Sequence, residues 1–376
     1  MLLFFLLLSF KLYAQEFNSL TLLDGQIKGI TYIKEGTEKT SRPVIWVHGI
    51  LETSHRWKEF MKDLPEQNHY AVNLPLHGIG ENITRLNGLN NYKTFYELVL
   101  PTIIEHVISS TGQQPLLVGY SLGARVIHDT LVKSPAISKN IHGVVELMRP
   151  TQLSKSIPFT KIPFRLPKPY LGFMQYLPTL PDILLMRKAS ALFLPAFPAG
   201  VYTHLEGTSM LQVEKYLVES HSTQIGNELN SDLIDDVNLE FSHTDHGIPT
   251  WFVWADNDLI CPGGAYAFDE MVRMRAEAFV PKSLTGNKRE EKIYEVIHQV
   301  LKRNFPPGFA PLYGTSMGAI GHVGGVIPGS QSAKLIGKGI QDMAYTPLHF
   351  SVPATVKFNL STKNSMLHIF DSWLGN

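Results

Sequence analysis

The sequence has little cysteine and no excess of charge of either sign. Its single cysteine, Cys261, excludes an intramolecular disulfide and leaves too few thiols for a thiolate-rich metal site. Thirty-three basic residues balance thirty-three acidic ones, and no zinc-type or RNA-binding motif is present, so we do not expect nucleic-acid binding. Of the 376 residues, 44% are hydrophobic and only 18% charged, which argues against a disordered chain. The chain is therefore expected to fold by packing a large core.

The apolar run at the N-terminus, Met1 to Phe10, is too short to span a bilayer, because a spanning helix needs about 20 residues. Followed by K-L-Y-A-Q, it resembles a signal segment with a cut after Ala14. No basic residue precedes the run, and Leu12 stands where a small residue is usual, so the alternative is a buried N-terminal segment. We expect residues 1–14 to direct export to the periplasm or the exterior; a protein without a signal would be cytoplasmic.

After a predicted hairpin over Leu20 to Ile33, with its turn at Asp24-Gly25, strands alternate with helices. Short apolar runs suit strands buried on both faces, and helical spacing of apolar residues follows several of them. The strands are expected at 43–47, 70–74, 115–118, 143–147 and 249–254, and the helices at 57–64, 92–109, 122–133 and 290–303. This alternation predicts an α/β fold with a mostly parallel sheet and helices on both faces.

The alternation stops after residue 150. Residues 151–200 contain eight prolines and carry six basic residues against one acidic residue, whereas residues 201–247 carry nine acidic residues against Lys215 alone. We interpret 151–247 as an inserted cap of short helices and loops, between a first core part (15–150) and a second (248–376). The basic stretch has two interpretations: contact with anionic head groups at a lipid surface, or pairing with the acidic stretch beside it, which we favour.

A serine lies where a predicted strand meets a predicted helix. Gly119-Tyr-Ser121-Leu-Gly123 has the form G-x-S-x-G, which places a serine on a strained turn with its hydroxyl above the sheet. The amide of Leu122, at the helix N-terminus, can then stabilise an oxyanion. The same pattern recurs around Ser316, but the sequence after it is too rich in glycine to begin a helix. Context therefore favours Ser121 as the nucleophile, with Ser316 a turn residue near the site.

The run V-I-W-V-His48-Gly49 ends a buried strand. A glycine there allows a sharp turn, so that the amide of Ile50 can face the serine as the second oxyanion donor.

Together these features resemble the α/β-hydrolase superfamily, over nearly the whole chain outside the cap. The family's D-x-P-G-x-G-like loop is matched by N-L-P-L-H-G-I-G from Asn73, which replaces the acid. Its catalytic acid follows a later strand in G-x-x-D-x-x-x-P, and the similar segment from Trp251 to Pro262 identifies Asp258, with Ala255 replacing the glycine. Asp256 is the alternative, more typical of a loop or capping residue.

The resemblance implies a histidine base after the last strand. Gly321-His322-Val-Gly is similar to the G-H-x-G form of polyester synthases and some lipases, although those synthases use cysteine as the nucleophile. His368 is the rival, but its apolar neighbours also suit a C-terminal amphipathic helix. His243 and His246 precede the acid and are interpreted as cap or loop residues. We choose His322.

The resemblance implies a serine hydrolase that uses Ser121, His322 and Asp258, forms an acyl-enzyme and needs no cofactor. Serine at this position argues against haloalkane dehalogenases and epoxide hydrolases, whose relatives carry aspartate there. The apolar cap residues have two interpretations: they line a cleft for a hydrophobic or lipid-like ester, or most of them only pack the cap onto the core. We expect a hydrophobic or lipid-like ester as substrate. The alternatives are a thioesterase or acyltransferase on the same residues, or an inactive binding module. Oligomeric state is not predicted.

Overall fold

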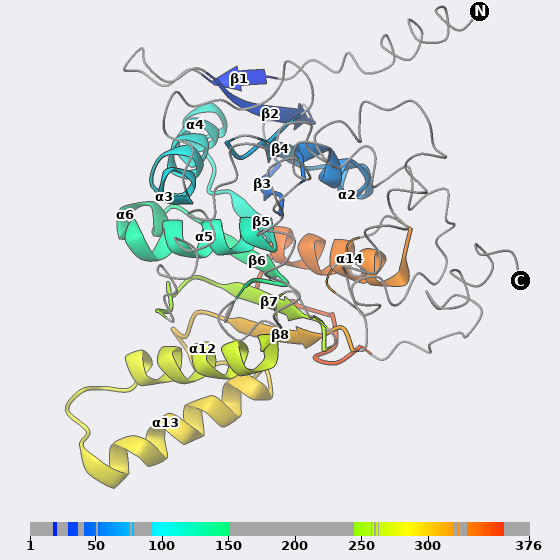
Figure 1. Cartoon of the computed structure of the whole chain (residues 1–376). Helices are drawn as coiled ribbons and strands as arrows, with labels where there is room; N and C mark the ends of the chain where they lie inside the picture. The colour runs from blue at the N-terminus through cyan, green and yellow to red at the C-terminus, as the bar shows by residue number, and fades with distance from the viewer. Residues whose placement is uncertain are drawn as a thin grey trace, which may run out of the picture.

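The computed structural model describes residues 18–20, 29–36, 41–49, 52–75, 77–78, 92–150, 244–256, 258, 261, 263–318, 322, 326 and 329–356. Within these ranges eight strands form a single sheet in the order β1-β2-β4-β3-β5-β6-β7-β8 (Figure 1). β1 pairs with β2 and β2 with β4 in antiparallel fashion, and every other neighbouring pair is parallel. The strands are β1 (Asn18–Leu20), β2 (Ile30–Glu35), β3 (Pro43–Val47), β4 (Asn68–Val72), β5 (Leu116–Tyr120), β6 (Gly143–Leu147), β7 (Thr250–Trp254) and β8 (Leu312–Ser316). The predicted α/β architecture with a mostly parallel sheet is confirmed.

The sheet has a separate hydrophobic core on each face. Trp46 and Val118 pack in one core, which includes Ile336 of α14, while Ile45 and Leu117 pack in the other. Successive strand residues point to opposite faces, so the buried apolar runs supply both cores. The helices are α2 (Lys58–Asp63), α3 (Tyr92–Thr94), α4 (Leu100–Thr111), α5 (Leu122–Lys133), α6 (Pro135–Ser138), α12 (Gly264–Phe279), α13 (Gly286–Leu301) and α14 (Gln331–Tyr345). Figure 1 shows α14 on the opposite side of the sheet from α4 and α5.

Most predicted elements occur within a few residues of their expected bounds. The predicted helix over 122–133 and strand over 143–147 match the structure, and the expected 92–109 helix is built from α3, a π-helical segment (Phe95–Val99) and α4. The strand expected at 70–74 instead starts at Asn68 and ends at Val72. β1 and β2 form the predicted antiparallel pair, while its turn at Asp24-Gly25 lies outside the described residues. The sequence patterns did not predict α12, β8 or α14.

β6 and β7 are adjacent and parallel, with the 151–247 segment between them in sequence. Residues 151–243 lie outside the described part, so the cap remains a prediction, as do the signal segment 1–14 and the boundaries drawn around both. Asp245 and His246, from the last residues assigned to the cap, contact core residues: Asp245 pairs with Arg275 of α12 at 2.6 Å. Among the described residues, no helix is both long and apolar enough to cross a bilayer.

Candidate active site

Ser121 occupies a strained turn between β5 and α5. Its φ of 50° and ψ of −121° are unusual for a residue with a side chain, and only two other described non-glycine residues, Met148 and Arg303, have a positive φ. The Ser121 N–H donates to the Leu147 carbonyl at 2.9 Å, which ties the turn to β6. Such a turn is the backbone geometry expected of a nucleophile placed at a strand-to-helix junction.

The two glycines of the motif are required by close packing. A Cβ on Gly119 would lie 2.6 Å from the Ala124 backbone in α5, and a Cβ on Gly123 would lie 2.3 Å from the Val47 carbonyl oxygen of β3. Real Cβ atoms do not approach other atoms so closely. Side chains at these two positions would therefore collide with the neighbouring strand and helix, which explains the glycines of the G-x-S-x-G pattern physically.

Asp258 and His322 form a buried hydrogen-bonded pair. Asp258 Oδ2 lies 2.7 Å from His322 Nδ1, and Asp258 Oδ1 accepts the N–H of Cys261 at 2.7 Å. Asp258 follows β7 and His322 follows β8, and these strands neighbour each other in the sheet, so their carboxyl ends bring the two side chains together. Both carboxylate oxygens of Asp258 thus have partners, and one of them orients the imidazole.

Asp256 has different partners. Its Oδ1 accepts hydrogen bonds from the Ser316 hydroxyl at 2.8 Å and the Trp254 indole at 3.2 Å. Ser316 is the last residue of β8 rather than a turn residue, and the next described helix begins only at Gln331. The carboxylate therefore links the ends of β7 and β8, while His322 contacts Asp258. His368 lies outside the described residues.

The hydroxyl of Ser121 makes no hydrogen bond to His322 among the described residues. Ser121 lies close enough to Cys261 to influence the pKa of its thiol, and potential ligand atoms of Cys261, Asp258 and His322 lie within 4.8 Å of one another. Burial and the nearby Asp258 charge raise the pKa of Cys261, although Ser121 opposes the shift. Ser121 is 4% exposed. Sequence reasoning considered Cys261 only for disulfides and thiolate-rich metal sites, although it lies within the same segment as Asp258.

A second set of side chains holds His322 from the β5 side. The Tyr120 hydroxyl donates to the His322 carbonyl at 3.2 Å, and the two rings lie 5.0 Å apart. Arg56 lies over the Tyr120 ring, with its guanidinium 3.6 Å from the ring centre, and forms an ion pair with Glu52. Sequence reasoning missed this set, because its residues come from three separate segments and follow no motif.

Of the two predicted oxyanion donors, Leu122 is described and Ile50 is not. Leu122 is the first residue of α5, where backbone N–H groups have no partner within the helix. The Gly49 N–H donates to Glu52 at 3.0 Å and is therefore occupied. His48 bridges two loops: its Nδ1 contacts the Gly49 carbonyl at 2.7 Å, and its Nε2 accepts the Leu74 N–H at 3.1 Å.

Asn73, which replaces the acid of the related motif, uses both ends of its amide. Its Oδ1 accepts the Ser54 N–H at 2.8 Å and its Nδ2 donates to the Thr31 hydroxyl at 3.0 Å. The amide therefore connects β2 and β4 to the loop that precedes α2.

Comparison with known proteins gives short sequence matches. No model of a known protein family matches the chain. A probable alcohol acetyltransferase of Cyberlindnera fabianii is 30% identical over 105 residues, 27% of this chain and 26% of that protein. A putative 2-succinyl-6-hydroxy-2,4-cyclohexadiene-1-carboxylate synthase of Haemophilus influenzae is 28% identical over 103 residues, 27% of this chain and 38% of that protein. The matches thus span well under half of either relative.

Solved structures match over most of the chain, although at low identity. An esterase of Thermogutta terrifontis covers 89% of this chain and is itself covered to 99%, with a TM-score of 0.51 and 13% identity. A membrane phospholipase A covers 92% with a TM-score of 0.52 and 12% identity, and is covered to 92%. An epoxide hydrolase of Vigna radiata covers 88% with a TM-score of 0.51 and 15% identity, and is covered to 97%. These likenesses establish the fold, and the different chemistries show that the fold alone does not decide the reaction.

Proposed function

Because the chain has the fold of the α/β-hydrolase superfamily, we propose that it is a serine hydrolase that cleaves carboxylic esters of a hydrophobic or lipid-like substrate. The observation that carries the proposal is the 2.7 Å bond between Asp258 and His322 beside the strained turn of Ser121. In the proposal, an acid, an imidazole and a nucleophile that follow β7, β8 and β5 act together, which is the arrangement that acyl transfer requires.

In the proposed mechanism, His322 accepts the proton of Ser121 as the hydroxyl attacks the ester carbonyl. Asp258 holds the proton of the imidazole on Nδ1, so that Nε2 is free to act as the base, and stabilises the imidazolium that forms. The amide of Leu122, together with that of Ile50, stabilises the tetrahedral oxyanion. The protonated His322 then donates to the departing alcohol, and water activated by the same imidazole releases the acid.

The mechanism requires the Ser121 hydroxyl to point towards His322 Nε2 when it reacts. Rotation about χ1 moves a serine hydroxyl between staggered positions without any change in the backbone. Catalytic hydrogen bonds are often long before the substrate binds. The proximity of Ser121 to the Cys261 thiol is compatible with the proposal, because a thiol is a weak hydrogen-bond partner.

One observation favours a second candidate, acyl transfer to an alcohol. The Cyberlindnera relative is a probable alcohol acetyltransferase, and the same acyl-enzyme would pass its acyl group to an alcohol instead of to water. A thioester donor would use the same residues. Added short and long alcohols separate the two reactions, since a transferase produces new ester while a hydrolase produces only free acid.

Labelling with a fluorophosphonate probe tests the proposal. The wild type is expected to react, Ser121→Ala to lose labelling, and Ser316→Ala, the matched control from the second G-x-S-x-G, to keep it. p-Nitrophenyl esters of rising chain length then measure substrate preference, with longer acyl chains expected to react better. Labelling that persists in Ser121→Ala would contradict the assignment, and a wild type inert to probe and esters would favour the binding-module alternative.

The base and the location of the protein need separate tests. His322→Ala is expected to abolish turnover and His368→Ala to retain it; the reverse result would make His368 the base.

For location we propose export through residues 1–14, based on the apolar segment at the N-terminus, and contact of the 151–247 segment with lipid-like substrate. Mass spectrometry of the protein from its host tests the export proposal, since cleavage after Ala14 leaves Gln15 as the first residue.

A further inference from the structure

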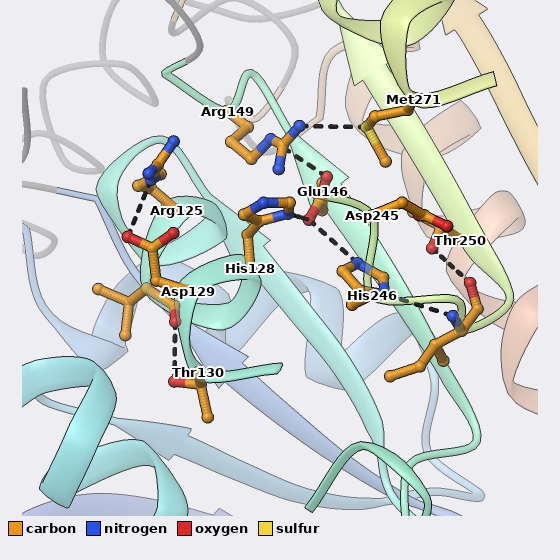
Figure 2. A network of polar contacts seen from close by, with 12 residues as sticks. Arg125, His128, Asp129, Thr130, Glu146, Arg149, Asp245, His246, Thr250 and Met271 are labelled. Carbon is orange, nitrogen blue, oxygen red and sulfur yellow. Dashed lines mark hydrogen bonds and ion pairs between the residues drawn. The ribbon is translucent and has the colours of Figure 1, made fainter. Parts of the chain in front are cut away.

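A second buried cluster of carboxylate and imidazole groups lies apart from Ser121. Glu146, the fourth residue of β6, is fully buried, and His128 of α5 and His246 before β7 approach it from two sides (Figure 2). Their side chains are at most 1% exposed. The proposed reaction uses none of them, and the sequence analysis treated His246 only as a cap or loop residue.

The separations in this cluster are long for hydrogen bonds. Glu146 Oε1 lies 3.4 Å from His128 Nδ1 and 3.7 Å from His246 Nε2. Among the described residues, neither Glu146 oxygen, neither His128 nitrogen nor His246 Nε2 has a hydrogen-bond partner of acceptable geometry. Buried polar atoms without such partners are uncommon in folded proteins and require a physical account.

The same separations fit a shared metal ion. Zn²⁺ binds histidine nitrogen and carboxylate oxygen at about 2.0 to 2.2 Å, so two ligands of a tetrahedron lie about 3.4 Å apart. One atom from each of the three side chains lies within 4.8 Å of the other two, so shifts of under an ångström bring all three to bonding distance. Two imidazoles and a carboxylate are a common ligand set for this ion, with water as the fourth ligand.

The protonation states also suit metal binding. Burial lowers the pKa of His128 to about 3, so its imidazole is neutral at pH 7. Burial alone would raise the pKa of Glu146, but the Arg149 guanidinium and the two histidines lower it well below its usual value, so the carboxylate is charged. Metal ions bind these deprotonated forms.

Two neighbours oppose the metal. Arg149 Nε lies 3.3 Å from Glu146 Oε2, so its positive charge would repel a cation bound to the other oxygen. The Ile248 N–H points at His246 Nδ1 from 3.4 Å, and this long contact must be lost when Nε2 binds a metal, because the imidazole proton then resides on Nδ1. We therefore expect weaker binding than at a cluster of the same ligands without a nearby arginine.

We propose that His128, Glu146 and His246 bind a divalent transition-metal ion, Zn²⁺ by ligand type, as a structural site. The ion would join α5, the helix that begins at the Ser121 turn, to β6 and to the segment through which the chain enters β7. The role of the ion is independent of the proposed hydrolase activity, since the ion would hold the segment between residue 243 and β7 against the core.

The test uses the full chain, without a histidine tag, stripped with chelator and titrated with Co²⁺. We expect about one equivalent to bind with the visible absorption of tetrahedral Co²⁺, and Zn²⁺ to displace it. Saturating Zn²⁺ should raise the thermal unfolding midpoint by about 5 °C, because a ligand that binds only the folded state stabilises it. No stoichiometric Co²⁺ absorption together with no shift by Zn²⁺ overturns the proposal.

Matched variants locate the ion. His128→Ala and His246→Ala should each lose the Co²⁺ absorption, while His142→Ala, which removes a histidine that contacts the Met343 carbonyl instead, should keep it. Cys261→Ser should also keep the Co²⁺ absorption, and the wild type should lack a thiolate charge-transfer band. These two results would exclude the group formed by Asp258, Cys261 and His322 as the metal site. Binding that survives in both alanine variants, or disappears in Cys261→Ser, overturns the assignment.

Arg149→Met provides a test that does not depend on removing a ligand. Loss of the nearby positive charge should strengthen Co²⁺ binding at least about tenfold if the metal lies beside Glu146. An unchanged or weaker affinity in folded Arg149→Met contradicts the proposed position. Because this variant predicts a gain, it remains decisive if an alanine variant fails to fold.

Discussion

Two buried carboxylates, Asp258 and Glu146, lie beside histidines, but they are bound in different ways. Asp258 makes two hydrogen bonds of 2.7 Å, one to the His322 ring and one to a backbone N–H. Glu146 has three nitrogen neighbours at 3.3 to 3.7 Å and no hydrogen bond of good geometry among the described residues. Short bonds orient a single imidazole, as a catalytic pair requires, whereas longer contacts to several elements suit a structural role.

The largest expected effects come from replacing each carboxylate with its amide, because one replacement should lower kcat and the other should lower stability. Asp258→Asn should reduce kcat for ester hydrolysis about 10⁴-fold, because the amide favours the wrong imidazole tautomer, and should leave the unfolding midpoint nearly unchanged. Glu146→Gln leaves Arg149 buried without its charge partner and should destabilise the fold by about 3 to 5 kcal/mol. Steady-state kinetics and thermal unfolding of both variants measure the contrast. Equal effects of the two variants on kcat would contradict the assignment of different roles to Asp258 and Glu146.

The helix that connects the two regions, α5, should be sensitive at its first turn. Gly123→Ala places a Cβ 2.3 Å from the Val47 carbonyl oxygen, and we expect a loss of about 2 to 3 kcal/mol of stability together with loss of probe labelling at Ser121. Gly337→Ala is the matched control: a Cβ there meets no atom within 4 Å, and alanine should stabilise α14 by up to about 1 kcal/mol. Thermal unfolding of the two variants measures the difference in their stability. A tolerated Gly123→Ala would contradict the packing argument.

Histidines outside both carboxylate groups should make the fold sensitive to acid. Burial lowers the pKa of His69 and of His77 to about 4, whereas unfolded histidine titrates near 6.5. Between these values the unfolded chain binds protons that the folded chain does not, so stability is retained above about pH 6.5 and falls towards pH 4. We expect the unfolding midpoint to drop by at least about 5 °C over this window. His69→Gln should reduce the drop; a flat profile would contradict the buried neutral histidines.

The smallest expected effect is on the reactivity of the Cys261 thiol, which lies near Asp258. Cys261 is buried and its pKa is raised by burial and by Asp258, so little reactive thiolate forms at neutral pH. Iodoacetamide should modify the native protein at least about tenfold more slowly than the chain unfolded in guanidinium, as intact-mass measurements would show. Rapid modification of the native protein would place the thiol in an open pocket instead.

Sequence patterns predicted the fold well where a signal is local. The G-x-S-x-G motif lies between an apolar strand and a helix, and the structure contains β5, the strained Ser121 turn and α5 at those positions. α12, β8 and α14 were not predicted, and α14 has a feature that explains why. α14 carries glycines at 337 and 339, which weaken a helical signal, and Gly339 is needed where Trp251 packs against it.

Within the candidate site, Asp258 and His322 were identified through resemblance to a family, and the structure places them in contact. Their alternatives could not be excluded by sequence, because Asp256 and Asp258 are two residues apart and fifteen histidines were available. Cys261, Glu52, Arg56 and the Glu146 cluster were not foreseen, because no motif marks them. The contacts of Arg56 with Tyr120 and of Glu146 with His128 and His246 form only in the folded chain.

The amino-acid sequence by itself determined the alternation of strands and helices, the position of the Ser121 turn and the balance of charge, because these depend on neighbouring residues. Only the tertiary structure decided which acid meets which histidine, what the thiol contacts, and that His128, Glu146 and His246 converge. Such choices depend on the order of strands in the sheet and on burial, which raises the energy of an unpaired polar group and so selects its partners.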